Sequence, residues 1–180
     1  QYEDDKRKRR GRPHDFIGFD EAPEFTRSQV QFVTTWLRTT KAGQNTQVAM
    51  AFNPPDTVDG EWIIDFFAPW LDDDFPDKAE DGEIRWAYVI EKNDGSFEDV
   101  WVSSSEPVVK DGITYYPQSR AFFKAKVEDN KYLMETGYDK QLDALPGELK
   151  LMMRDGVIRR QLKDNPLQVI PREWIKAAQK

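Results

Sequence analysis

Two short apolar runs near the beginning of the 180-residue chain restrict its fold more than any other feature. Residues 16–19 end in the adjacent carboxylates Asp20 and Glu21, and residues 48–52 end at Asn53. Apolar residues on both faces of each run predict strands that are buried on both sides, as in a parallel sheet covered by helices. A helix is predicted between them, so the segment forms a strand–helix–strand unit with parallel strands and a right-handed crossover.

The intervening segment carries the signals of an amphipathic helix from about residue 26 to residue 40. Thr26 and Gln29 have the spacing of a capping box, which predicts the start of the helix. One face of this helix is apolar and is predicted to join the core; it consists of Val30, Val33, Trp36 and Leu37.

The two carboxylates follow the first predicted strand, where ligands of open α/β sheets bind. We interpret them as a nucleotide-hydrolysis pair, in which Asp20 holds Mg²⁺ through its water shell and Glu21 orients or deprotonates the attacking water. Parallel strands would bring Asn53 to the same sheet edge, where its amide could bind a phosphate oxygen or the water. The alternative is that the acids begin a helix whose dipole favours them, and that Asn53 begins a turn before two prolines.

The rest of the chain predicts β-hairpins followed by short helices. A short helix is expected over residues 61–67 and hairpins over 84–102 and 108–116, each hairpin with a turn that contains glycine. A strand is expected over residues 121–125. Asn130 is a predicted N-cap of a helical region that continues to about Gly156, followed by an extended segment at 167–170 and a last helix containing Trp174.

Composition excludes several classes of site. The chain has no cysteine and one histidine, which excludes disulfides, thiolate zinc sites and histidine-rich metal sites. A net charge of −7 does not favour a general nucleic-acid binder. No apolar run approaches the roughly 20 residues of a transmembrane helix, and the charged N-terminus is not signal-like, so we expect a soluble, intracellular protein. Residues 72–74 are acidic but lack the spacing of a calcium loop, and His14 is expected at the surface or in a turn.

The basic run of residues 6–12 has two interpretations. It is either a solvated, mobile arm or the source of an arginine that acts on phosphate, for which the planar, permanently charged guanidinium is suited.

Several segments together resemble the large subunit of tailed-phage terminases, the ATP-driven motor that packages DNA. Residues 15–22 resemble its Walker B segment, and residues 48–54 resemble the next strand and coupling motif. Further segments resemble the end of its ATPase domain and the linker to its nuclease domain; they are residues 119–122, 128–133, 142–146 and 168–174.

The resemblance implies roles for individual residues. Asp20 would be the Walker B residue on the Mg²⁺ side, and Glu21 would be the catalytic carboxylate. Asn53 would couple the state of the phosphate to movement. Arg10, or alternatively Arg12, would be the arginine that reaches the ATP of a neighbouring subunit. ATP and Mg²⁺ are the implied cofactors of the complete protein.

The implied fold is α/β, with part of a P-loop NTPase-type parallel sheet, an added β-hairpin region and a helical C-terminal part. Residues 1–156 would be a partial ATPase domain, and residues 157–180 would be the linker and the start of the nuclease domain. The implied partners are double-stranded DNA, the portal protein, the small terminase subunit and sibling subunits in a homo-oligomeric ring. No membrane is implied, and the expected location is the cytoplasm of a bacterial host.

The departures from the family restrict these expectations. The 180 residues contain no G-x-x-x-x-G-K-[ST] motif and no nuclease carboxylates, so the chain resembles a piece of a longer ATPase and endonuclease. We expect this chain alone to hydrolyse little ATP. The alternative is a non-catalytic binding or structural module derived from a terminase or another P-loop ATPase. A helicase is disfavoured, because its downstream motifs are lacking.

Overall fold

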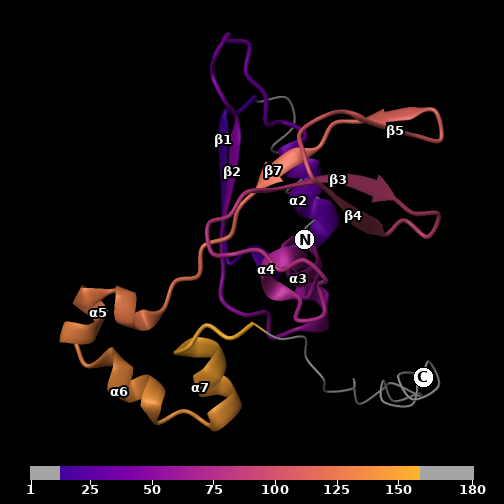
Figure 1. The fold of residues 1–180 in the computed structure, drawn as a ribbon. Coiled ribbons are helices and arrows are strands. Elements are labelled where there is room, and N and C mark those ends of the chain that lie inside the picture. The colour runs from indigo at the N-terminus through magenta and orange to yellow at the C-terminus, as the bar shows by residue number, and fades with distance from the viewer. Residues whose placement is uncertain (1–12, 159–180) are drawn as a thin grey trace, which may run out of the picture. The chain divides into compact units, whose positions relative to one another are not determined.

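A computed structural model describes residues 13–158, which fall into two compact units, residues 13–61 and Trp62–Ile158. The described residues form a mixed α/β structure with one parallel strand pair, a three-stranded antiparallel sheet and an antiparallel hairpin (Figure 1). The α/β class is therefore confirmed. The unit boundary at Glu61 falls inside the segment predicted to be one partial ATPase domain. The elements expected over residues 167–180 lie outside the described residues.

The first unit contains the predicted parallel strands. Strands β1 (Phe16–Asp20) and β2 (Gln47–Ala51) pair in parallel, in a register that places Asp20 beside Ala51. The prediction of burial on both faces was wrong. Only alternate residues of β1, such as Phe19, are buried, whereas Phe16 on the other face is 55% exposed. The described residues bury one face of this sheet and leave the other face open.

Helix α2 (Arg27–Thr34) begins as its sequence predicts. The Gln29 amide donates to Thr26 Oγ1 at 3.3 Å, and the Thr26 amide donates to Gln29 Oε1 at 2.9 Å. This reciprocal capping box satisfies two amides that the first turn of a helix leaves without a partner. Val30 is buried to 3% exposure and joins the core of the unit, as predicted, whereas the other residues of the predicted apolar face are only half-buried: Val33, Trp36 and Leu37.

The same helix ends earlier than predicted, at Thr34 instead of about residue 40. His14 N donates to the carbonyl of Trp36 at 3.0 Å, and Arg38 N donates to the carbonyl of His14 at 2.8 Å. These bonds form a parallel bridge between His14 and Leu37. Because the bridge takes backbone groups that a longer helix would need, it replaces the last predicted turn with extended chain.

The second unit contains the predicted hairpins. Strands β3 (Arg85–Glu91) and β4 (Phe97–Val102) form the first, and β5 (Val108–Lys110) and β6 (Ile113–Tyr115) form the second. A short strand, β7 (Gln118–Arg120), pairs with β3 on the side opposite β4. Both hairpins are confirmed.

The strand predicted over residues 121–125 was wrong, because β7 ends at Arg120. Beyond it, Gly82 N donates to the carbonyl of Phe122 at 2.8 Å, but Lys124 N donates to a side chain, that of Asp81, at 2.6 Å. A side-chain acceptor in place of a backbone carbonyl interrupts the ladder at this point.

Two short helices, α3 (Trp62–Phe66) and α4 (Ala68–Leu71), precede the sheet of this unit, and the first confirms the helix predicted over residues 61–67. Arg120 of β7 connects α3 to the sheet. Its guanidinium lies 2.6 Å from Asp99 of β4, donates to the carbonyl of Phe66 at 2.8 Å and covers the Phe66 ring at 3.7 Å. The paired side chains are 9% and 2% exposed, so this is a buried ion pair.

Three short helices follow: α5 (Lys131–Glu135), α6 (Tyr138–Asp143) and α7 (Gly147–Met153). Asn130 is the N-cap of α5, as predicted, because its side-chain oxygen accepts hydrogen bonds at 3.2 Å from the amides of Tyr132 and Leu133, two and three residues later. Within residues 13–158, no helix has the length and apolar character needed to cross a membrane.

Candidate active site at the ends of β1 and β2

The carboxyl ends of the two parallel strands bring together the side chains singled out in the sequence. Asn53 Nδ2 donates a hydrogen bond to Glu21 Oε1 at 3.0 Å, across 32 residues of chain. Asp20 is the last residue of β1 and lies beside Ala51 in the sheet. The prediction that Asn53 emerges next to the carboxylates is therefore confirmed.

Glu21 has an unusual backbone conformation. Its φ is 51° and its ψ is 53°, which is the left-handed region. A side chain with a Cβ atom enters this region at a cost of roughly 1–2 kcal/mol. Strained residues of this kind cluster at functional sites, where the surrounding structure holds them in place. No pattern in the sequence predicts this conformation, because neither glycine nor asparagine occupies the position.

Each of the two loops that carry the polar side chains continues into a buried residue. Asp20, Glu21 and Asn53 are exposed, whereas Ala22 and Pro55 are buried. The short helix η1 (Ala22–Glu24) follows Glu21 immediately. The polar side chains are thus exposed to solvent, while the residues that follow them are packed in the interior.

The donor set at this edge suits a hydrated magnesium ion. Mg²⁺ commonly binds through one or two carboxylates and keeps several of its waters. Asp20 and Glu21 supply exposed carboxylate oxygens, and the side chain of Asp20 makes no hydrogen bond or ion pair with another described residue. Among residues 13–158, no group of three or more acidic or histidine side chains could enclose a metal ion. The two exposed carboxylates of this edge are thus the side chains that could hold a hydrated ion.

The two arginines named from the sequence, Arg10 and Arg12, lie outside the described residues, as does the basic run that contains them. His14 is exposed, and its backbone pairs with the extended chain at Trp36 and Arg38, beyond the end of α2.

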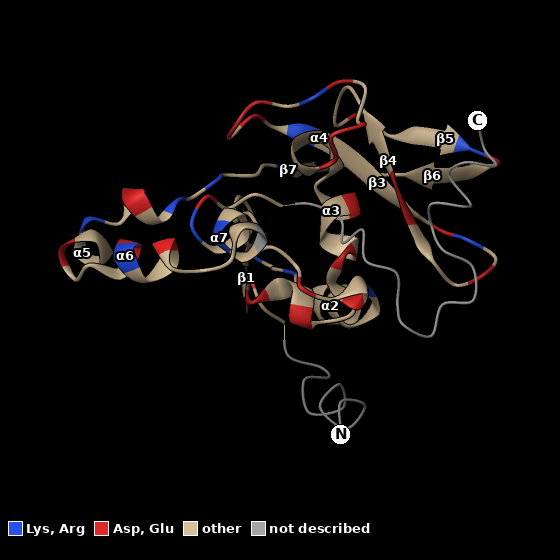
Figure 2. Ribbon diagram, turned by 90° about the horizontal axis from the view of Figure 1, so that it is seen from below, with Lys and Arg blue, Asp and Glu red and all other residues tan. Residues whose placement is uncertain are grey.

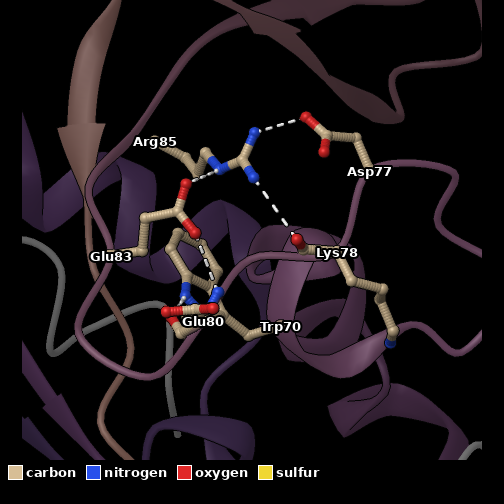
Figure 3. A network of polar contacts seen from close by, with 6 residues as sticks. All are labelled: Trp70, Asp77, Lys78, Glu80, Glu83 and Arg85. Carbon is tan, nitrogen blue, oxygen red and sulfur yellow. Dashed lines mark hydrogen bonds and ion pairs between the residues drawn. The ribbon is translucent and has the colours of Figure 1, made fainter.

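The acidic loop between α4 and β3 is organised by ion pairs (acidic residues are red in Figure 2). Arg85 lies 2.6 Å from Asp77 and 2.8 Å from Glu83, and Trp70 Nε1 donates to the carbonyl of Glu80 at 2.9 Å (Figure 3). The hydrogen bond from Arg85, together with its charge, lowers the pKa of the Asp77 carboxyl, and the same bond raises the pKa of Arg85. These contacts order the loop, and nothing in them forms a site for a metal ion.

Comparisons of the chain with protein-family models, with curated proteins and with solved structures gave no match.

Proposed function

We propose that these residues are part of the ATP-hydrolysing motor of a phage or prophage terminase large subunit, which moves double-stranded DNA into procapsids. The observation that carries the proposal is the 3.0 Å hydrogen bond between Asn53 and Glu21, at the carboxyl ends of two parallel strands. That edge is where open α/β sheets bind their ligands. The resemblance of the segments around both residues to Walker B and to the coupling motif supports the same assignment.

In this proposal Glu21 is the general base. Asn53 donates to Oε1, which leaves the other oxygen of the carboxylate able to accept a proton or hydrogen bond from the attacking water. Asp20 would hold Mg²⁺ through water, and the ion would supply positive charge to offset that of the phosphates. Because Asn53 contacts Glu21 directly, a change at the phosphate can reach the loop that follows β2.

The phosphate cradle comes from residues other than these 180, since they contain no Walker A motif. Arg10, or alternatively Arg12, reaches the nucleotide of a neighbouring subunit in a ring. Double-stranded DNA, the portal protein and the small terminase subunit are the proposed partners, and the host cytoplasm is the proposed location.

The test compares the 180-residue chain with a longer protein in which a Walker A segment precedes it. We expect Mg²⁺-dependent phosphate release from the longer protein and little from the chain alone. Glu21→Gln should lower turnover by a factor of about 100 or more, as removal of a general base does. Glu24→Gln changes an exposed acid three residues away and should leave turnover unchanged. The proposal fails if the longer protein, with an intact P-loop, neither hydrolyses ATP nor packages DNA.

A second candidate is a non-catalytic binding or structural module that has kept the motor fold. The absence of a Walker A motif from the 180 residues favours it. The reading frame of the gene separates the two candidates: a Walker A motif upstream supports the motor, whereas a start codon near Gln1 supports the module.

A further inference from the structure

We infer that Gly60 is a positioning residue, which sets the spacing between Glu21 and Asn53; its functional meaning rests on the proposed function. Two loops follow the parallel strands and carry the polar side chains of the candidate site. Glu21 is followed two residues later by Pro23, and Asn53 is followed two residues later by Pro55. Each polar side chain therefore stands on a short segment whose end is stiffened by a proline ring.

Gly60 lies between these prolines. It is the last residue of η2 (Val58–Gly60), which packs against η1. A Cβ atom added at Gly60 would lie 3.0 Å from Pro23 Cβ, 3.1 Å from the Pro23 carbonyl oxygen and 3.1 Å from Pro55 Cβ. All three distances are shorter than an ordinary van der Waals contact, so one hydrogen atom in place of a side chain permits this approach.

Space, and not backbone conformation, requires glycine here. Gly60 is not among the residues with positive φ, so alanine could adopt its backbone angles without strain. Its amide donates within η2, to the Thr57 carbonyl at 3.2 Å and to Thr57 Oγ1 at 3.3 Å. Because Gly60 is tied to its own turn and the neighbouring atoms belong to proline rings and backbone, an added methyl group has to push the two loops apart.

That displacement acts on the candidate site directly. The hydrogen bond between Asn53 and Glu21 connects the same two loops on their exposed side, and it has a length of 3.0 Å. Separation of the prolines by a few tenths of an ångström lengthens or breaks this bond. Gly60 therefore controls how Asn53 presents its amide to the Glu21 carboxylate, although Gly60 has no side chain that could contact either residue.

The test observes the side-chain amide of Asn53 in the full chain by ¹H–¹⁵N NMR. Glu21→Ala removes the acceptor and marks the amide signals of a free Asn53. We expect Gly60→Ala to move the signals more than half of the way to that position. Gly18→Ala is the matched control, because its Cβ atom would meet only the Phe16 ring at 3.5 Å or more, and it should leave the signals unchanged.

The outcomes separate this inference from the proposed function. A folded Gly60→Ala variant whose Asn53 signals match those of the unmodified chain refutes the positioning role, even if its melting temperature falls. If Gly60→Ala does not fold, Pro55→Gly removes the facing Cβ atom, and it should shift the same signals; unchanged signals refute the role. The measurement needs no nucleotide, so failure of a longer protein to hydrolyse ATP refutes the proposed function alone.

Discussion

The side-chain amide of Asn53 lies 3.0 Å from a carboxylate oxygen of Glu21, although 32 residues separate the two in the chain. Both residues follow strands of one parallel pair, so the sheet brings them to the same edge. The loops that follow the strands then set the distance between the two side chains. The contact ties an exposed carboxylate to a second loop. Substitutions at this pair are therefore expected to affect activity and stability differently.

Replacement of Asn53 by alanine should affect activity more than stability. The hydrogen bond is exposed, so its loss should lower the free energy of unfolding by less than about 1 kcal/mol. In the longer protein that carries a Walker A segment, we expect turnover to fall by about tenfold or more, since Glu21 would lose the group that orients it. Urea unfolding and phosphate-release assays measure the two effects.

Asn45→Ala is the control for this change, because Asn45 is an exposed residue of the same unit outside the candidate site. Equal losses of turnover in the two variants would contradict a specific role for Asn53.

Replacement of Glu21 by glycine should not destabilise the fold. Relief of a left-handed conformation recovers roughly 1–2 kcal/mol. The added freedom of glycine in the unfolded chain offsets about 0.4–1 kcal/mol of this gain. Loss of the exposed hydrogen bond from Asn53 offsets less than about 1 kcal/mol more. We expect the free energy of unfolding to change little, while ATP turnover in the longer protein is lost.

Asp111→Gly provides the matched comparison. Asp111 is the other described residue with a side chain and a positive φ, 52°, and it lies in the turn between β5 and β6. The Asp111→Gly variant should change the free energy of unfolding about as little as Glu21→Gly does, but it should leave turnover unchanged. A large loss of stability in Glu21→Gly would show that the side chain of Glu21 holds the turn together, and that its backbone is not under net strain.

The buried ion pair between Arg120 and Asp99 should be the most sensitive electrostatic contact in the second unit. Arg120→Met leaves a buried carboxylate without its cation, which typically costs about 3–5 kcal/mol. Lys92→Met breaks the exposed pair with Glu98, in which the two side chains are 51% and 52% exposed, and should cost less than about 1 kcal/mol. Denaturant unfolding of both variants checks the contrast. Similar losses would mean that the Arg120 pair is not buried in solution.

The Asp77 carboxyl should titrate below its ordinary range, because Arg85 donates a hydrogen bond to it and carries a positive charge beside it, which together lower its pKa. A lowered pKa in the folded state means that the contribution of this pair to stability is present above the ordinary pKa of 3.8 and is lost as the pH falls through the lowered value. Carboxylate NMR titration of the chain measures the shift.

Arg85→Gln removes the guanidinium and should return the pKa of Asp77 toward its ordinary value. An unchanged titration of Asp77 in this variant would contradict the assigned cause of the shift.

Much of the local structure could be predicted, because its causes are local. The capping box of Thr26 and Gln29, the cap formed by Asn130 and the glycine-containing turns of both hairpins depend on residues a few positions apart. Asn53 could also be placed near Glu21, since strand–helix–strand connectivity makes the strands parallel and brings their ends to one edge.

The errors occurred where distant residues compete for the same backbone or surface. Helix α2 ends early because His14, far away in the chain, pairs with the backbone of Trp36 and Arg38. The strand expected after Arg120 stops where the Asp81 side chain accepts a hydrogen bond. Phe16 is exposed because the described residues cover only one face of β1.

For the candidate site, the sequence by itself determined which side chains meet: two carboxylates after one apolar run and an amide after the next. Only the tertiary structure decided how they meet. The left-handed backbone of Glu21, its 3.0 Å contact with Asn53 and the close approach of Gly60 to two prolines all depend on the packing of one loop against another. No local pattern encodes that spacing, because it is set by contacts between segments that the chain brings together only when it folds.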